Sequence, residues 1–360
     1  MHSPPVPASP RHAPALPHPF NDKQGENMKR LSACIAILAL TAVGAAVPAM
    51  AASDHVVLYS ANDDTVNKLV ADGFKQSTGL TVNVISTGSG VLFRRIASEQ
   101  GNPQADVVWG VSAALLKQNS KYFQPYAVQG RDVVPAPYRD PDNLWVGTNI
   151  QVVTINRNSK AIPDKDAPKR WEDLLDAKWK GRIAYTDPAN SGFSYAAATA
   201  LLQAWGDNDA AWQKFGKLVA NAKVLNRSTL VFDGNGSGEY PLGISLEYAG
   251  FLWAHNGAPV AVGYPADGTV ALAEGAAIIK GGPDPDNARK LIDYLASKPT
   301  QEMLLKATFR RPARQDIDLS VAGNMPPFSA IKVLPYDDAK WESTRAETLR
   351  RLKTTIQETR

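Results

Sequence analysis

The fold of this chain is decided by residues 55–110, which read HVVLYSANDDTVNKLVADGFKQSTGLTVNVISTGSGVLFRRIASEQGNPQADVVWG. Apolar runs of strand length alternate there with segments in which apolar residues recur at helical spacing, as Val66, Val70 and Phe74 do. The predicted strands lie at 55–60, 80–85 and 106–109, and the predicted helices at 66–74 and 92–98. This order predicts a parallel sheet covered by helices, an α/β lobe.

The alternation of strands and helices starts again after Arg157 and predicts a second α/β lobe. Further strands are predicted at 181–185 and 242–245, and helices at 171–175, 192–205, 209–221, 247–256, 285–297, 300–307 and 338–359. Extended stretches near 145–155 and 260–275 are the expected crossovers between the lobes. We therefore assign residues 52–148 and 268–360 to lobe one and 149–267 to lobe two, and the cleft between them is the expected ligand site.

Composition excludes several classes of protein. The 360 residues include 39 Lys plus Arg and 35 Asp plus Glu, with no long basic block, so nucleic acid is not the expected partner. Five histidines and one cysteine exclude a zinc ribbon and a disulfide scaffold. The chain contains no motif of a Walker loop, a zinc protease or a serine hydrolase. No cofactor and no catalytic residue are predicted.

The N-terminal residues predict export. Residues 1–27 are rich in proline and are interpreted as disordered or as the product of a misassigned start codon. Residues 28–51 have the basic start, apolar middle and small-residue end of a signal peptide, so we expect cleavage after Ala51 and a periplasmic protein. The alternatives are an uncleaved membrane anchor and a lipid attached at Cys34.

Two glycine-serine turns stand where a predicted strand gives way to a helix, at 86–90 and 190–194. Free backbone N–H groups and hydroxyls at a helix N-terminus form an anion site, with Ser89 and Gly90 in one turn and Ser191 and Gly192 in the other. The alternative is that Ser89 and Ser191 only cap their helices.

Other candidates are single residues near the predicted cleft. Trp109 at a strand end is expected to face the cleft, where its ring would pack on a sugar. Glu247 and Tyr248 open a helix and supply acceptors there. Residues 233–238 resemble the first half of a calcium loop, but Ile244 stands where the closing glutamate belongs, so we interpret them as a flexible turn and predict no metal site.

Six stretches resemble the iron(III)/organophosphate group of ABC-transporter solute-binding proteins. They are VLYSA at 57–61, GSG at 88–90, NPQADVVWG at 102–110, WKGRIAY at 179–185, GEYPLG at 238–243 and EGAAI at 274–278. The resemblance implies a type 2 periplasmic binding protein with two lobes and a hinge. It also implies a receptor, expected to be a monomer, that delivers its ligand to an ABC permease in the inner membrane.

The resemblance also bears on the ligand. Positions that hold iron in ferric members are Asp63, Val111 and Tyr248-Ala249 here, a set too poor in anionic oxygens for iron(III). The implied anion-binding residues are the turn Ser191-Gly192-Phe193 together with Ser112 and either Ser228 or Thr229, and the implied polar groups for the rest of the ligand are Asn62, Asp63, Asp233 and Glu247. We expect a phosphorylated small organic anion, a sugar phosphate or a phosphonate. Ferric iron remains the alternative, and a secreted phosphatase lacks the residues it would need.

Overall fold

The protein is described by a computed structural model over residues 53–359. The predicted signal peptide and the segment before it lie outside the described residues. Within residues 53–359, no helix is both long enough and apolar enough to cross a membrane.

Lobe one is built on strands that alternate with helices, as the sequence predicts. β1 pairs in parallel with both β2 and β3. The chain can turn into α1 because Asp63 accepts a hydrogen bond from the backbone N–H of Val66, and it can leave α1 because Gly79 adopts a φ of 76°. The elements are β1 (His55–Ser60), α1 (Asp64–Thr78), β2 (Thr81–Ser86), α2 (Ser89–Ser98), β3 (Val107–Ser112), α3 (Ala113–Gln118), α8 (Pro285–Ala296) and α9 (Lys298–Thr308).

Lobe two repeats this architecture around a second parallel set of strands, in which β5 pairs with β6 and β7. Its elements are β5 (Ile183–Thr186), α4 (Gly192–Ala204), α5 (Asp209–Asn221), β6 (Ala222–Leu225), α6 (Ser228–Ser237), β7 (Leu242–Leu246), α7 (Glu247–His255) and β8 (Val260–Gly263).

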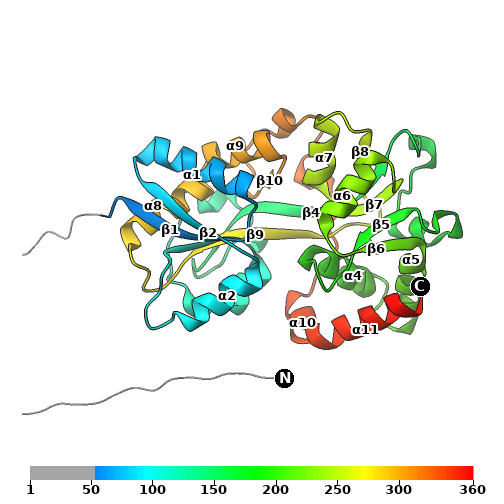
Figure 1. The fold of residues 1–360 in the computed structure, drawn as a ribbon, viewed down its shortest axis with the longest axis horizontal. Coiled ribbons are helices and arrows are strands. Elements are labelled where there is room, and N and C mark those ends of the chain that lie inside the picture. The colour runs from blue at the N-terminus through cyan, green and yellow to red at the C-terminus, as the bar shows by residue number, and fades with distance from the viewer. Residues whose placement is uncertain (1–52, 360) are drawn as a thin grey trace, which may run out of the picture. The chain divides into compact units, whose positions relative to one another are not determined.

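Two long strands join the lobes, β4 (Val146–Asn158) and β9 (Ala271–Ile278) (Figure 1). Residues 146–152 of β4 pair antiparallel with β9, and residues 153–158 pair with β7 and β8. The short strand β10 (Arg311–Pro312) adds to β4 from the other side. The strand order β2-β1-β3-β9-β4-β7-β5-β6 therefore holds a parallel set at each end and two antiparallel crossovers between them, which confirms the predicted two-lobe α/β fold.

Each lobe has its own hydrophobic core. The first core includes β4 residues up to Val152, and the second core begins with Val153. β4 therefore passes from one core to the other between Val152 and Val153, which makes it a crossover between the lobes, as its extended sequence suggests.

The C-terminal segment differs from the expected boundary, which assigned residues 268–360 to lobe one. Ile331 lies in the first core, but Trp341, Leu352 and Ile356 lie in the second. Helices α10 (Asp338–Ser343) and α11 (Arg345–Glu358) therefore belong to lobe two, and the chain crosses between the lobes a third time. Periodicity predicts a helix here but not which core its apolar side meets.

The predicted flexible turn at 233–238 is wrong. Residues 233–237 form the last turn of α6, and Gly238 ends the helix with a φ of 87°. Gly234 is buried, and a Cβ there would lie 2.5 Å from the ring of Tyr240. The glycines that suggest a loop are therefore required by close packing.

Candidate functional site

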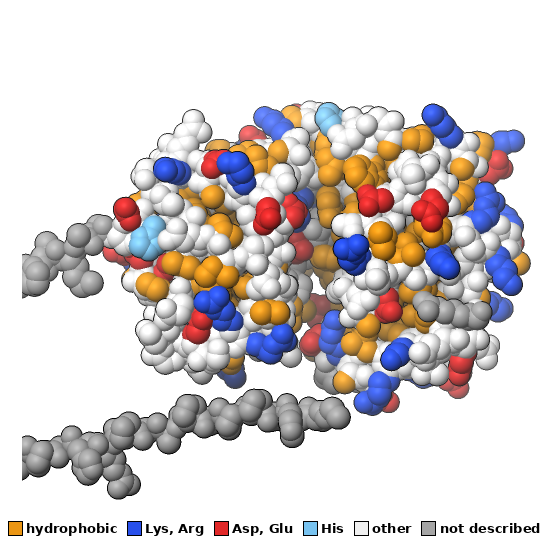
Figure 2. Space-filling view, in the orientation of Figure 1, with side chains coloured by type: hydrophobic (Ala, Val, Ile, Leu, Met, Phe, Trp, Pro, Cys, Tyr) orange, Lys and Arg blue, Asp and Glu red, His pale blue; other side chains and the backbone are white. Residues whose placement is uncertain are grey.

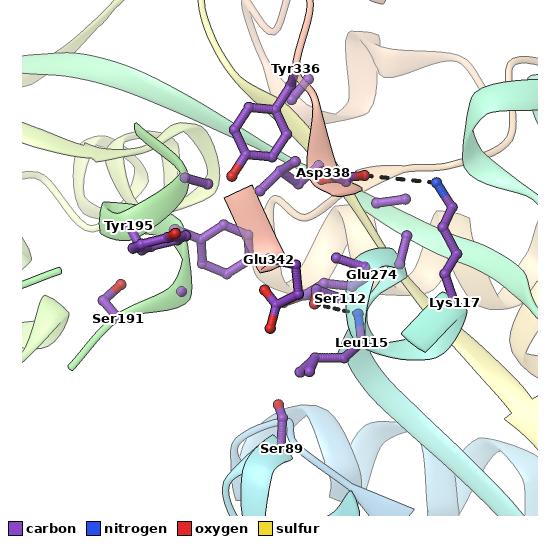
Figure 3. Close-up of a pocket in the computed structure, with 18 of the residues that line it drawn as sticks. Ser89, Ser112, Leu115, Lys117, Ser191, Tyr195, Glu274, Tyr336, Asp338 and Glu342 are labelled. Carbon is purple, nitrogen blue, oxygen red and sulfur yellow. Dashed lines mark hydrogen bonds and ion pairs between the residues drawn. The ribbon is translucent and has the colours of Figure 1, made fainter. Parts of the chain in front are cut away.

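A cavity of about 940 Å³ lies in the cleft between the lobes (Figure 3). Its walls come from the starts of α2 and α4, from α3, from β9 and from the C-terminal segment 333–345. This volume is within the range of small-molecule sites. Figure 2 shows the surface hollowed between the two lobes, with charged side chains beside the opening.

Both predicted glycine-serine turns border this cavity. Ser89 and Gly90 begin α2 on lobe one, and Ser191, Gly192 and Phe193 begin α4 on lobe two. Ser191 is also the N-cap of α4, because its Oγ accepts a hydrogen bond of 3.3 Å from the N–H of Ser194. The N-cap of α2 is Gly88, so Ser89 is the first residue of the helix and does not cap it. The fold thus brings the two predicted anion turns to one cleft from opposite lobes.

A small polar recess opens beside the cleft on lobe two. Its volume is about 20 Å³, and it shares Ser191 and Phe193 with the large cavity. We call it the hydroxyl recess, because five hydroxyl side chains line it: Thr186, Ser191, Ser194, Ser228 and Ser245. The recess can hold one water-sized group, since roughly 10–15 Å³ is enough for a water.

The hydroxyls of this recess are only partly satisfied. Thr186 donates to Ser228 over 3.3 Å, and Ser228 donates to Ser191 over 3.4 Å. Ser245 is 6% exposed, and its Oγ has no hydrogen-bond partner. A buried hydroxyl without a partner in the chain is uncommon in native proteins, and it leaves Ser245 available to a ligand or a water.

Secondary structure adds to the electrostatics of the hydroxyl recess. Thr186 ends β5 and Ser245 lies at the end of β7, so the carboxyl ends of two parallel strands meet there. Ser191 and Ser228 stand at the N-termini of α4 and α6. Helix N-termini carry partial positive charge, so the recess suits one oxygen of an anion.

Thr186 and Ser245 were not among the residues predicted from the sequence, whereas Ser194 lies within the predicted turn at 190–194. Thr186 and Ser245 follow or end predicted strands, and ligands of α/β sheets bind outside the carboxyl ends of the strands. That rule, applied to the second lobe, could have found these two residues.

Three of the predicted ligand carboxylates lie elsewhere. Glu247 is 1% exposed and forms a two-pronged ion pair with Arg311, with distances of 2.8 and 2.7 Å, and it also accepts a hydrogen bond from Tyr264. Asp63 caps α1 and pairs with Arg310 over 3.2 Å. Asp233 is exposed on α6, outside the cavity. The expectation that Glu247 presents a free acceptor to the cleft is therefore wrong.

Arg310 and Arg311 organise a charged group, which we call the arginine cluster (Asp63, Glu247, Glu274, Arg310 and Arg311), and within it only Asp63 is exposed. Arg310 lies 3.4 Å from Glu274 and 5.1 Å from the centre of the Tyr248 ring. Glu274 also borders the cavity, but hydrogen bonds from Asn149 and Gln151 engage it. Burial raises the pKa of the Tyr248 phenol, so it stays protonated at neutral pH.

Trp109 does not face the cleft. Its strand continues to Ser112, so the indole is in mid-strand, 1% exposed, with its N–H donating to Thr148 Oγ1 over 3.0 Å. The strand bulges at Gly110, whose φ is 76° and where a Cβ would lie 2.2 Å from the Asn62 amide. Trp109 and Asn62 are therefore parts of the interior.

The remaining predicted residues divide between the cavity and its surroundings. Ser112 borders the cavity and caps α3, with its Oγ accepting from Leu115 over 3.4 Å. Thr229 is exposed at the start of α6, outside the cavity. Tyr248 lies beneath Arg310, outside the cavity.

The C-terminal wall of the cavity was also missed. Tyr336, Asp338, Glu342 and Arg345 border the cavity from this wall, opposite Lys117 of lobe one. Asp338 lies 3.7 Å from Lys117, and burial raises the pKa of its carboxyl in spite of that lysine. No short-range pattern marks this wall, because the segment reaches the cleft only by crossing between the lobes.

Residues 53–359 contain no group of three or more His, Cys, Asp and Glu side chains that could hold a metal ion. The positions that the resemblance assigns to iron ligands include buried Val111, and Arg310 lies between Asp63 and Tyr248.

These features are those of a two-lobe binding receptor, and the relationships of the chain agree. Residues 102–341 match the family of bacterial extracellular solute-binding proteins, to which this chain belongs. Members of this family are substrate-binding receptors of ABC transporters and not enzymes. The chain is thus a periplasmic-type solute-binding protein of an ABC importer.

Three relatives, two of which are named for different ligands, have similar sequence identity to this chain. A putative 2-aminoethylphosphonate-binding periplasmic protein of Salmonella typhimurium is 28% identical over 78% of this chain and 85% of its own. A probable ABC transporter periplasmic-binding protein of Sinorhizobium fredii is 30% identical over 76% and 77%. Iron uptake protein A1 of Synechocystis is 28% identical over 74% and 78%.

Among solved structures, the periplasmic binding protein AfuA from Actinobacillus pleuropneumoniae, determined with fructose 6-phosphate, superimposes with a TM-score of 0.73. It is 26% identical, and the match covers 84% of this chain and 98% of that one.

Proposed function

We propose that this protein is exported to the periplasm and there binds a phosphorylated small organic anion, a sugar phosphate or a phosphonate, for an ABC permease of the inner membrane. It acts as a monomer. The ligand lies in the cleft, with its phosphoryl group at the hydroxyl recess.

The observation that carries this proposal is the unpartnered hydroxyl of Ser245 in the hydroxyl recess. A phosphoryl oxygen there would accept hydrogen bonds from Ser245 and from its neighbours at the starts of α4 and α6. Each bond from a hydroxyl to a charged oxygen is stronger than one between neutral groups. The site therefore recognises an anion with donors and helix dipoles, without needing a lysine or arginine in the recess.

Lobe one completes the site when the lobes approach. Ser89 and Ser112 border the cavity from the side opposite Ser191. A ligand that contacts both lobes favours the closed state by the extra contacts it makes there. Compaction on ligand binding is therefore part of the proposal, with hinges in β4 and in the chain that leads into β9.

The arginine cluster argues against the ferric alternative, which the name of the Synechocystis relative keeps open. Asp63 is already paired with Arg310, and the guanidinium covers the ring of Tyr248. A trivalent cation placed between these residues would meet the positive charge of the Arg310 guanidinium.

The first experiment identifies the ligand. Protein purified without refolding is weighed by native mass spectrometry, and the apo protein is then titrated calorimetrically with glucose 6-phosphate, fructose 6-phosphate and 2-aminoethylphosphonate. We expect one phosphorylated compound to bind with a stoichiometry of one and to be released unchanged. Hydrolysis of the compound would indicate a phosphatase instead.

The same preparation tests iron. Addition of ferric citrate to apo protein should produce no visible tyrosinate-to-iron charge-transfer band. A band that disappears in Tyr248→Phe would overturn the proposed ligand class and favour the ferric receptor.

A further inference from the structure

Three carboxylates border the large cavity, and each has at least one oxygen without a hydrogen-bond partner among the described residues. The bonds that Glu274 accepts, from Arg310 and two amides, all reach its Oε2, and Asp338 lies 3.7 Å from Lys117. Glu342 of α10 makes a single contact, 3.4 Å from one oxygen to Arg345, and its other oxygen has no partner among the described residues. Figure 3 shows this carboxylate directed into the space that Ser191, Ser89 and Ser112 border.

The side chains around Glu342 include the rings of Tyr195 and Tyr336 and the cations Arg345 and Lys117. The hydroxyl of Tyr195 donates to the carbonyl of Trp341 over 2.6 Å, and that of Tyr336 is 3.0 Å from Thr199 Oγ1. Tyr336 is partly exposed where it borders the cavity, whereas Tyr195 is only 2% exposed. Arg345 lies 4.2 Å from the Tyr195 ring centre, so that ring already stabilises a cation of the chain.

A carboxylate in the same cavity as a phosphoryl site has a consequence for selectivity. A ligand that carries only negative charge would bring its phosphoryl group towards Glu342, and like charges in a partly desolvated cleft repel. A ligand that also carries an ammonium group would pair with the free oxygen of Glu342. Repulsion of the purely anionic ligand and attraction of the ligand with an ammonium group both increase the preference for the second ligand.

We infer that Glu342 binds a cationic amino group of the ligand, so that the protein selects an aminoalkyl phosphonate or phosphate over a sugar phosphate. This inference rests on the proposed function, because the hydroxyl recess must hold the phosphoryl end. It assigns selectivity to the C-terminal segment, one residue beyond the part of the chain that matches the family.

The test compares two probes that differ only in the amino group, 2-aminoethylphosphonate and ethylphosphonate, by calorimetry at low salt. Wild type should prefer the amine about tenfold to a hundredfold, the range of a charge-assisted hydrogen bond. Glu342→Gln should lose most of this preference and bind ethylphosphonate at least as tightly as wild type. The control Glu347→Gln alters an exposed carboxylate on α11 that does not border the cavity, and it should preserve the preference.

Two results would overturn the inference while the proposed function stands. One is equal binding of both probes, or tighter binding of glucose 6-phosphate, by wild type; this readout needs no variant and does not depend on the folding of Glu342→Gln. The other is a folded Glu342→Gln protein that retains the full preference. Failure of wild type to bind any phosphorylated probe would instead overturn the proposed function and this inference together.

Discussion

The hydroxyl recess and the arginine cluster are both polar and both contain buried groups, but these groups are satisfied in different ways. In the arginine cluster, Glu247 and Arg311 pair through two short hydrogen bonds, and each carboxylate has a partner. In the hydroxyl recess the contacts are long, and Ser245 has none.

This difference separates groups that hold the fold from groups available to a ligand. The folded state has a lower free energy with both members of a buried ion pair than with one member removed. A charge that is already paired within the chain has little capacity to bind a ligand. A buried hydroxyl without a partner costs stability until something binds it. Substitutions in the two regions should therefore affect different measurements.

The largest effect is expected in the arginine cluster. Glu247→Gln keeps the shape of the side chain but leaves Arg311 as a buried, uncompensated charge, so the free energy of unfolding should fall by about 3–5 kcal/mol. Chemical denaturation of the ligand-free protein measures this. Asp233→Asn, at an exposed carboxylate, should change it by less than about 0.5 kcal/mol. A loss below about 1 kcal/mol for Glu247→Gln would show that the pair is not structural.

Ser191→Ala should weaken ligand binding by about 1.5–3 kcal/mol, which is roughly tenfold to a hundredfold in the dissociation constant. It should also cost about 1 kcal/mol of stability, because Ser191 caps α4. Ser297 caps α9 in the same way, away from the cavity, so Ser297→Ala should show the stability loss alone. Unchanged affinity in Ser191→Ala would reduce this residue to a helix cap.

Ser245→Ala gives the smallest effect and the sharpest contrast, because its two consequences have opposite signs. Removal of an unpartnered buried hydroxyl should leave the unfolding free energy of the apo protein unchanged or slightly higher, while the ligand dissociation constant rises about fivefold for a lost bond of about 1 kcal/mol. Ser60 is buried and donates to Asn67 over 2.6 Å, so Ser60→Ala should lose stability. Equal destabilisation by both changes would contradict a ligand role for Ser245.

Several parts of the site were predictable from the sequence because they depend on short segments. The turn at Ser89 and the turn at Ser191 each follow a strand pattern and precede a helix pattern, and both reach the cleft. Parallel strands place the starts of the following helices at one edge of their sheet. The order of strand, turn and helix along the chain was therefore sufficient to predict that these turns reach the cleft.

Trp109 and Glu247 show where local order fails. The sequence shows a strand near Trp109 but not that it continues to Ser112, and this extension determines that the indole is covered on both faces. Glu247 does begin a helix, as predicted, but its partner Arg311 is 64 positions away. Nothing near Glu247 in the chain indicates that its charge is already paired.

The sequence by itself determined the order of strands and helices, the two lobes, the crossovers and the two glycine-serine turns, because periodicity and turn chemistry act over a few residues. Only the tertiary structure decided which charges pair and which remain available. Asp63 meets Arg310 across 247 positions, and α10 brings Glu342 to the cleft through a third crossing between the lobes. Coulombic pairing and burial depend on distance in space, and the fold alone sets that distance.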